Sequence, residues 1–341
     1  MSWKKTAIRL AAGALAALLL ALAVFLTIFP RVSAAPHMMV DLSEARIKRG
    51  AYLFNNVMGC RGCHTPVIEP AAYSFPTDPA RTGAGRLMGG PEDGLPAPIH
   101  SPNITPFELS GWSDGEIYRA ITAGVNRQGQ SLFPLMPYQA YATLDRRDIE
   151  DVIAYLRTLP SQNGHQPENS LPFPLSLLVR TAPHDAASQP RPPETDKLAY
   201  GAYLSRAAGC FDCHTQANNR NQPVGTPFAG GRAFPAHGYV IYSPNLTPDR
   251  KTGLGIWTRA RFIGRFRALT PDATRQMAVP AGSPNTPMPW SELSGMTDTD
   301  LDAIFTYLKS LPPVRNDQPM VQLEPGRDMP KAAIPSDSAK N

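Results

Sequence analysis

The hydrophobic pattern of the chain separates its first thirty-odd residues from everything that follows. An almost unbroken apolar run extends from Leu10 to Phe29, after three basic residues, and Pro30 and Arg31 close it. These twenty residues, as a helix, would span roughly 30 Å, the thickness of the hydrocarbon core of a bilayer. Basic residues ahead of such a run keep the N-terminus in the cytoplasm and send the rest of the chain across. Residues 1–34 are therefore predicted to be a membrane anchor or a signal.

A cleaved signal peptide is the alternative to a retained anchor. Val32-Ser33-Ala34 resembles a small-residue cleavage site. The apolar run is longer than the core of a usual signal peptide, which favours the anchor. Both interpretations export residues 35–341.

Two later segments show the periodicity of amphipathic helices. Their apolar residues fall at i, i+3, i+4 and i+7, and these are Ile149, Val152, Ile153 and Leu156 in one segment and Leu301, Ile304, Phe305 and Leu308 in the other. The candidate N-caps are Thr143 or Asp145 for the first helix and Thr297 or Thr299 for the second. A proline follows each segment and marks its end. We interpret both apolar stripes as core.

Composition adds long irregular connections to this helical pattern. The chain has 37 Pro and 26 Gly, and only 8% of its residues are aromatic, which indicates many turns and loops. The sequence therefore predicts an all-α fold with long Pro/Gly-rich loops and one N-terminal transmembrane helix.

The net charge of +5 reflects the N-terminal segment. Residues 1–34 hold four basic residues and no acidic one, and the remainder holds 29 basic against 28 acidic residues. An exported part with a net charge of only +1 gives no case for nucleic-acid binding.

All four cysteines lie in two copies of one motif. These are Cys60-Arg61-Gly62-Cys63-His64 and Cys210-Phe211-Asp212-Cys213-His214. C-x-x-C-H is the attachment signature of c-type haem, in which two thiols on one helical turn reach the two vinyl groups and the histidine ligates the iron. Cys60, Cys63, Cys210 and Cys213 are thus predicted to hold two covalently bound haem c groups.

Three other interpretations of these cysteines compete with haem attachment. A redox-active disulfide needs only the C-x-x-C pair. A zinc site usually needs four close Cys or His ligands. Chance is the third. None of the three requires a histidine after the second cysteine, yet His64 and His214 occupy that place in both copies.

An internal repeat extends well beyond the cysteine motifs. The matching pairs are Gly50-Ala51-Tyr52-Leu53 with Gly201-Ala202-Tyr203-Leu204, Ser101-Pro102-Asn103-Ile104-Thr105-Pro106 with Ser243-Pro244-Asn245-Leu246-Thr247-Pro248, Met136-Pro137-Tyr138 with Met288-Pro289-Trp290, and residues 154–160 with 306–312. The first cysteines are 150 residues apart, the two methionines 152, and the Ser-Pro-Asn copies 142. Length differences in loops between fixed anchor points indicate one fold used twice.

The repeat also selects candidates for the second axial ligand of each iron. Met136 and Met288 lie in equivalent Met-Pro-aromatic turns, and a thioether sulfur suits low-spin haem iron. An internal methionine more often fills a gap in the hydrophobic core. Proline, however, fixes the turn, and a fixed turn suits a sulfur that must be held over a haem ring. His100 and His237 are the rivals, and they do not occupy equivalent positions.

These features divide the chain into five predicted parts. They are a membrane anchor or signal (1–34), a first haem domain (41–160), a Pro-rich linker (161–195), a second haem domain (196–315) and a mobile tail (316–341). The linker's apolar stretch, Leu171 to Val179, is expected to pack on its own domains, with docking on a partner as the alternative.

The combination of motifs resembles a known family over nearly all of residues 43–315. The duplicated Ser-Pro-Asn-(Ile/Leu)-Thr-Pro, the Gly111-Trp112 and Ile256-Trp257 segments, Met-Pro-aromatic and the closing Tyr-Leu-x-x-Leu-Pro look like the cytochrome c subunit of bacterial membrane-bound alcohol and gluconate dehydrogenases. Those subunits generally have three haem domains, and this chain has two. Related diheme subunits serve other periplasmic dehydrogenases, including molybdenum-containing aldehyde-type enzymes.

The resemblance implies a function as well as a fold. It implies a tandem pair of class I cytochrome c folds in the periplasm, held at the bacterial inner membrane. The chain would relay electrons from a periplasmic dehydrogenase to quinone or a terminal oxidase, and would not itself be an enzyme. The alternatives are a diheme cytochrome c peroxidase-like enzyme and the haem subunit of an oxidase complex. A thiosulfate-oxidising diheme enzyme is less favoured, because no cysteine remains for an unusual iron ligand.

Overall fold

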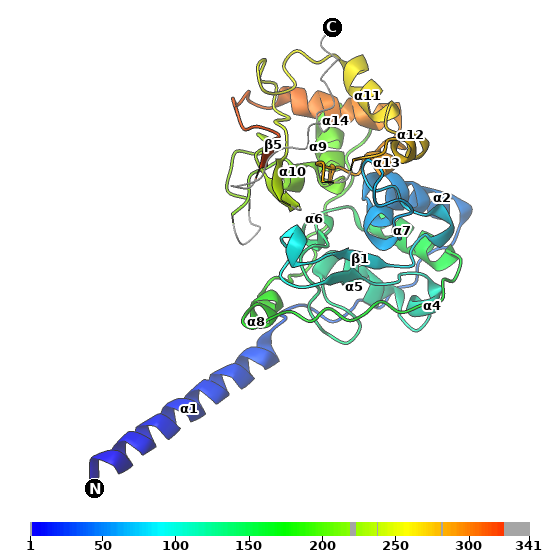
Figure 1. The fold of residues 1–341 in the computed structure, drawn as a ribbon. Helices are drawn as coiled ribbons and strands as arrows, with labels where there is room; N and C mark the ends of the chain where they lie inside the picture. Colours follow the sequence, from blue (N-terminus) through cyan, green and yellow to red (C-terminus); the bar gives the residue numbers. More distant parts are fainter. Residues whose placement is uncertain (1, 219–222, 237, 281, 324–341) are drawn as a thin grey trace.

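The fold is described from a computed structural model that covers residues 2–218, 223–236, 238–280 and 282–323 (Figure 1). Helix α1, Ser2–Ile28, projects away from the rest of the molecule, and its segment Trp3–Ile28 is long and apolar enough to cross a membrane. An N-terminal signal sequence satisfies the same criteria of length and composition.

The first half of the folded part contains six α-helices and several short elements. The helices are α2 (Glu44–Tyr52), α3 (Cys60–His64), α4 (Pro106–Leu109), α5 (Asp114–Ala123), α6 (Tyr138–Tyr141) and α7 (Arg146–Thr158). Between them lie a π-helical turn η1 (Leu53–Val57), two 3₁₀ turns η2 (Pro79–Arg81) and η3 (Pro91–Asp93), and strands β1 (Arg86–Gly89) and β2 (Ile99–Ser101).

A second set of elements follows the linker, and it too begins with a long helix followed by the cysteine-motif turn and closes with a long helix. They are α9 (Lys197–Ala207), α10 (Cys210–Cys213), α11 (Arg259–Arg267), α12 (Pro271–Gln276), α13 (Trp290–Leu293) and α14 (Asp298–Ser310), with strands β3 (Ala233–Ala236), β4 (Tyr239–Tyr242) and β5 (Val321–Leu323). We call residues 43–160 the first half and residues 196–312 the second half.

The fold is mainly helical, but it is not all-α as the sequence had suggested. Strands β1 and β2 pair antiparallel in the first half, and β3, β4 and β5 form a three-stranded antiparallel sheet in the second. Strand β5 lies in what was predicted to be a mobile tail, so that prediction is wrong for residues 321–323. The rest of the predicted tail, 324–341, lies outside the described residues. These strands are too short for a period-two pattern to identify them in the sequence.

In each half the core forms where the first helix crosses the last. Helix α2 packs on α7, and α9 packs on α14. A glycine permits each close approach: a Cβ on Gly50 would lie 1.8 Å from the Asp151 carbonyl oxygen, and one on Gly201 would lie 2.0 Å from that of Ala303. The apolar stripes predicted for the last helices are buried in this core.

The predicted ends of the last helices are confirmed. Asp145 caps α7 by accepting from the backbone N–H of Arg147, and Thr297 caps α14 by accepting from that of Asp300. Each helix ends two residues before the proline that the sequence marked.

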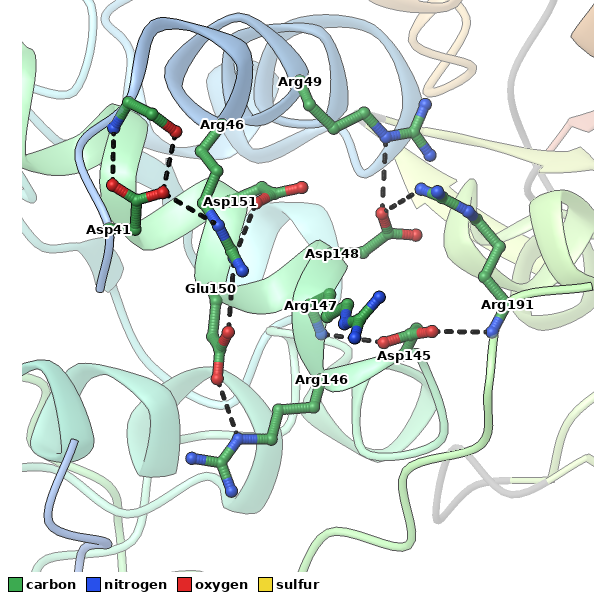
Figure 2. A network of polar contacts seen from close by, with 11 residues as sticks. Asp41, Arg46, Arg49, Asp145, Arg146, Arg147, Asp148, Glu150, Asp151 and Arg191 are labelled. Carbon is green, nitrogen blue, oxygen red and sulfur yellow. Dashed lines mark hydrogen bonds and ion pairs between the residues drawn. The ribbon is translucent and has the colours of Figure 1, made fainter. Parts of the chain in front are cut away.

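The linker packs along the folded part and contains a short helix, α8 (Leu175–Leu178), followed by a 3₁₀ turn η4 (Val179–Thr181). Near its end, Arg191 binds Asp148 of α7 with an Nη1–Oδ1 distance of 2.6 Å (Figure 2). Arg49 of α2 contacts the same carboxylate at 3.3 Å. The linker is therefore tied to the first half by an ion pair on a carboxylate that is only 1% exposed.

The two halves contact each other in a reciprocal way. Helix α6 of the first half packs on α9 of the second half. In return, α13 of the second half, which is equivalent to α6, packs on η1 of the first half. The turn η1 continues α2, and α2 is the equivalent of α9. When the same surface is used on both sides, the two units are related by an approximate twofold axis.

Candidate functional site

Each C-x-x-C-H motif forms a single helical turn entered through a left-handed glycine. Gly59 has a φ of 66° and precedes Cys60, and Gly209 has a φ of 69° and precedes Cys210. Other residues rarely adopt this conformation, so glycine fixes the direction in which the turn begins. The turn places both cysteines of a motif on one short helix.

The four thiols are not paired in disulfides. Burial raises the pKa of Cys60 and that of Cys210 to about 12, and the charge of the second thiol in each motif adds to the effect. A redox-active C-x-x-C pair needs the opposite, a lowered pKa that yields a thiolate. The setting of the cysteines thus disfavours thioredoxin-like chemistry and suits thiols held for covalent attachment.

The zinc interpretation finds no support among the described residues. Within residues 2–218, 223–236, 238–280 and 282–323, no group of three or more His, Cys, Asp and Glu is arranged to hold a metal ion. The thiols of each motif are instead accompanied by a single imidazole.

Both imidazoles are oriented by a backbone carbonyl of the repeated Ser-Pro-Asn segment. His64 Nδ1 lies 2.9 Å from the Pro102 oxygen, and His214 Nδ1 lies 2.8 Å from the Pro244 oxygen. Burial lowers the pKa of both imidazoles, which favours the neutral form. In that form Nδ1 donates to the carbonyl and Nε2 is left as the basic nitrogen for an iron.

Buried asparagines brace the segments that supply these carbonyls. The Asn103 Oδ1 atom accepts from the backbone N–H of Thr105 at 2.9 Å and from its hydroxyl at 2.7 Å. Asn245 and Thr247 repeat these two bonds with the same distances. Sequence comparison of the halves marked this segment, but only the folded chain shows that it holds the histidines.

The two Met-Pro-aromatic turns have the same local geometry. The Tyr138 N–H donates to the Met136 carbonyl at 2.8 Å, and the Trp290 N–H donates to the Met288 carbonyl at 2.8 Å. Both methionine side chains are half-buried and pack against the hydrophobic core. Met58 and Met296, in contrast, are fully buried core residues.

The rival ligand His100 lies on β2, where its backbone N–H donates to Asn169 Oδ1 at 2.6 Å. Its ring is half-buried, and no hydrogen bond reaches its Nδ1 from the described residues. The other rival, His237, lies outside the described residues.

The cysteine motifs of the two halves lie near each other at the interface. Tyr141 of α6 is buried between them and donates its hydroxyl to the Met58 carbonyl at 2.6 Å. Its pKa is raised well above the ordinary value by burial and, further, by the charges of the cysteines of both motifs. Sequence comparison of the halves does not mark Tyr141, because it corresponds to Leu293 in the repeat.

The residues that the structure brings together fit haem c. Each half offers two free thiols on one turn and an imidazole whose Nδ1 is already engaged. Such an imidazole presents its Nε2 in one fixed orientation, as iron ligands require.

Comparison with known proteins shows the family of the chain. The cytochrome c family profile matches the chain twice, at residues 47–160 and 198–312. The cytochrome c subunit of the quinone-dependent alcohol dehydrogenase of Gluconacetobacter polyoxogenes is 30% identical over 290 residues, which are 80% of this chain and 58% of that protein.

Two further relatives are similar over most of this chain. The cytochrome c subunit of gluconate 2-dehydrogenase from Pantoea cypripedii is 28% identical over 79% of this chain and 60% of its own length. A diheme c-type cytochrome of Cereibacter sphaeroides is 27% identical over 75% of this chain and 83% of its own length. The chain thus spans somewhat more than half the length of the dehydrogenase subunits that it matches. With one copy of the matched domain in each half, the chain belongs to the cytochrome c family and carries two covalently bound haem c groups.

Proposed function

We propose that this protein is the electron-transfer subunit of a dehydrogenase. Residues 41–160 and 196–315 would each form one haem domain on the periplasmic side of the bacterial inner membrane, with α1 as a retained anchor. Electrons would arrive from a periplasmic dehydrogenase subunit and leave to quinone or a terminal oxidase. The names of the relatives support the dehydrogenase partner.

In each half, the proposed ligands are one histidine and one methionine. His64 and Met136 would hold one iron, and His214 and Met288 the other. When bound, each haem supplies an iron that takes up and releases one electron. The side chains of this protein would occupy both axial positions, which leaves no position for a substrate and favours transfer over catalysis.

The observation that carries this proposal is that the two histidines have equivalent hydrogen-bond partners in the two halves. In both halves Nδ1 is bound to a proline carbonyl at 2.8 to 2.9 Å, and in both halves a Met-Pro turn with the same backbone hydrogen bond is present. A peroxidase-like diheme enzyme needs one iron with an accessible sixth position and nearby acid–base groups, so its two sites would differ.

Methionine replacement tests the ligand assignment. We expect the reduced native protein to bind no carbon monoxide, Met136→Ala and Met288→Ala to bind one equivalent each, and the double variant two. Met277→Ala, which alters an exposed methionine, serves as the control and should behave like the native protein. One equivalent of carbon monoxide bound by the native protein, with rapid peroxide consumption, would support the peroxidase-like alternative instead.

The partner is tested separately. The tagged protein is purified from its native membrane in mild detergent, and the co-purifying subunits are identified by mass spectrometry. A soluble-type dehydrogenase subunit is expected. Large integral oxidase subunits in its place would identify the protein as part of an oxidase complex.

A further inference from the structure

The linker exposes large apolar side chains at one place. Phe173 is 79% exposed and Leu178, at the end of α8, is 59% exposed. The surrounding segment 169–184 contains no acidic residue. Apolar side chains of this size gathered on a surface usually mark a contact with a protein or a membrane.

This part of the linker is bound to the end of α1. The Arg180 guanidinium donates to the Leu26 carbonyl at 3.0 Å and also to the Phe29 carbonyl. A few residues further on, Asp185 accepts from the Ser33 N–H at 2.8 Å and from its hydroxyl at 2.9 Å. Figure 1 shows α8 directly beside the point where α1 joins the folded part. The exposed side chains therefore lie at the level where a membrane-spanning α1 would leave the bilayer.

We propose that residues 171–178 lie in the boundary between lipid headgroups and acyl chains. This inference rests on the proposed function, in which α1 stays in the membrane. A single helix would let the folded part tilt and rotate freely. A second apolar contact beside the first removes much of that freedom and holds the two haem halves in one orientation toward membrane-bound partners.

The cysteine inventory makes a clean test possible. With all four cysteines in thioether bonds, an introduced cysteine is the only thiol that a spin label can reach. The full-length protein is reconstituted in phosphatidylcholine–phosphatidylglycerol vesicles, with a label at Phe173→Cys or, as control, at the similarly apolar and exposed Ile256→Cys of the second half. Collision of each label with oxygen, which concentrates in lipid, is compared with collision with a water-soluble nickel chelate.

We expect the Phe173→Cys label to favour oxygen and the Ile256→Cys label to favour the nickel chelate. Preference for the chelate at both positions would overturn the inference, because residue 173 would then lie in water and not at the lipid boundary. Labelling of the unsubstituted protein would show that the cysteines are not all bound, and loss of the chain from the vesicles would show that α1 is no anchor. Either of these results defeats the proposed function, and the membrane contact with it.

A second inference concerns a buried carboxyl that crosses the interface. Glu292 of α13 is only 4% exposed and accepts from the Thr77 hydroxyl of the first half at 3.3 Å. It lies beside the first cysteine motif, because a Cβ built on Gly62 would be 3.5 Å from the Glu292 carboxyl carbon. Arg61 and Arg86 are the basic groups that face the Glu292 carboxyl, and its charge acts on the Cys63 thiol.

Among the described residues, the first half offers no equivalent carboxyl to the second motif. The residue equivalent to Glu292 is Ala140, and the second motif has its own carboxyl, Asp212, at the place of Gly62. Arg232 and Arg206 face Asp212, as Arg86 and Arg61 face Glu292. The second motif thus has a carboxylate of its own, Asp212. The first motif has none, and Glu292 of the other half supplies the corresponding negative charge.

The geometry points to Glu292 as a positioning residue that sets the reduction potential of the haem held by the first half. It rests on the proposed assignment of that haem to Cys60, Cys63, His64 and Met136. A negative charge beside a haem stabilises its oxidised state, so loss of the charge should raise the potential. A variant in the second half is therefore expected to change the haem of the first.

Potentiometric titration at pH 9 tests this. Met136→His marks the first haem, since a histidine in place of methionine lowers its potential. In this background we expect Glu292→Gln to shift the marked wave upward and Glu44→Gln, an exposed control, to shift neither wave. A marked wave that does not move, or a shift confined to the other wave, would overturn the inference. If Met136→His moves neither wave, the ligand assignment fails first.

Discussion

Tyr52 of the first half donates its hydroxyl to Asp300 of the second half at 2.5 Å, and Tyr203 of the second half donates to Asp148 of the first at 2.6 Å. The two tyrosines occupy the same place in the repeat, and the two aspartates are 152 residues apart, like the proposed methionine ligands. Each hydroxyl also accepts from a backbone N–H of the opposite half, that of Thr297 at 3.0 Å for Tyr52. The duplicated chain therefore folds like a homodimer joined by a linker.

Removal of one of these hydroxyls should weaken the interface. Because Asp300 and Asp148 are buried, a partner lost from either carboxylate costs about 1.5–3 kcal/mol. We expect Tyr52→Phe to reach the upper part of this range and Tyr203→Phe the lower, since Asp148 keeps Arg49 and Arg191. Chemical denaturation of the holoprotein measures both. Tyr242→Phe, whose hydroxyl bonds to an exposed glutamine, is the control; equal small losses in all three variants would contradict this account.

The crossing of first and last helices should not tolerate a methyl group. In Gly50→Ala and Gly201→Ala the new Cβ meets a backbone oxygen at about 2 Å, which cannot move without shifting a helix. We expect a loss of about 3 kcal/mol or more and reduced haem incorporation, measured by denaturation and by haem content. Gly264→Ala, in α11 with open space around it, should instead gain about 0.5–1 kcal/mol.

Loosening of the segments that hold the histidines should affect stability and haem together. Asn103→Ala leaves the Thr105 N–H and hydroxyl without their acceptor, at about 1–3 kcal/mol. Asn245→Ala leaves the Thr247 N–H without its acceptor, whereas the Thr247 hydroxyl keeps the Val314 carbonyl at 3.2 Å, so we expect a smaller loss there. The thermal midpoint should fall in both variants, and the potential of one haem should change in each. Gln128→Ala, which alters an exposed amide side chain away from these segments, should change neither; a fall in stability without any change in potential would show that Asn103 and Asn245 do not act on the histidines.

The Glu292 carboxyl should make stability depend on pH. Burial raises its pKa in the folded protein, while Arg61, Thr77 and Arg86 oppose the rise. The folded state then binds more protons than the unfolded one above about pH 4.5, so this carboxyl lowers stability as the pH rises through its folded pKa. We expect Glu292→Gln to be more stable than the native protein at pH 8 and to lose that advantage near pH 4. Parallel pH profiles from urea denaturation would contradict the prediction.

Local patterns identified the parts of this protein whose structure is set by neighbouring residues. The C-x-x-C-H turns, the capped and amphipathic last helices, and the apolar N-terminal helix each depend on residues within a few turns of one another. The repeat added correspondence between the halves, because two copies of one fold preserve anchor residues while their loops change length.

The sequence alone therefore determined the cofactor chemistry, the duplication and the helical framework. Only the tertiary structure decided which distant residues are in contact. These contacts are the proline carbonyls on His64 and His214, the pairing of the short strands, the reciprocal tyrosines, and Glu292 beside the cysteine motif of the other half. Several of these contacts join residues more than two hundred positions apart, and the repeat cannot mark Glu292, because its equivalent residue is Ala140. Periodicity and motif spacing carry information about a residue's own element, whereas an interface is selected by the packing of whole surfaces.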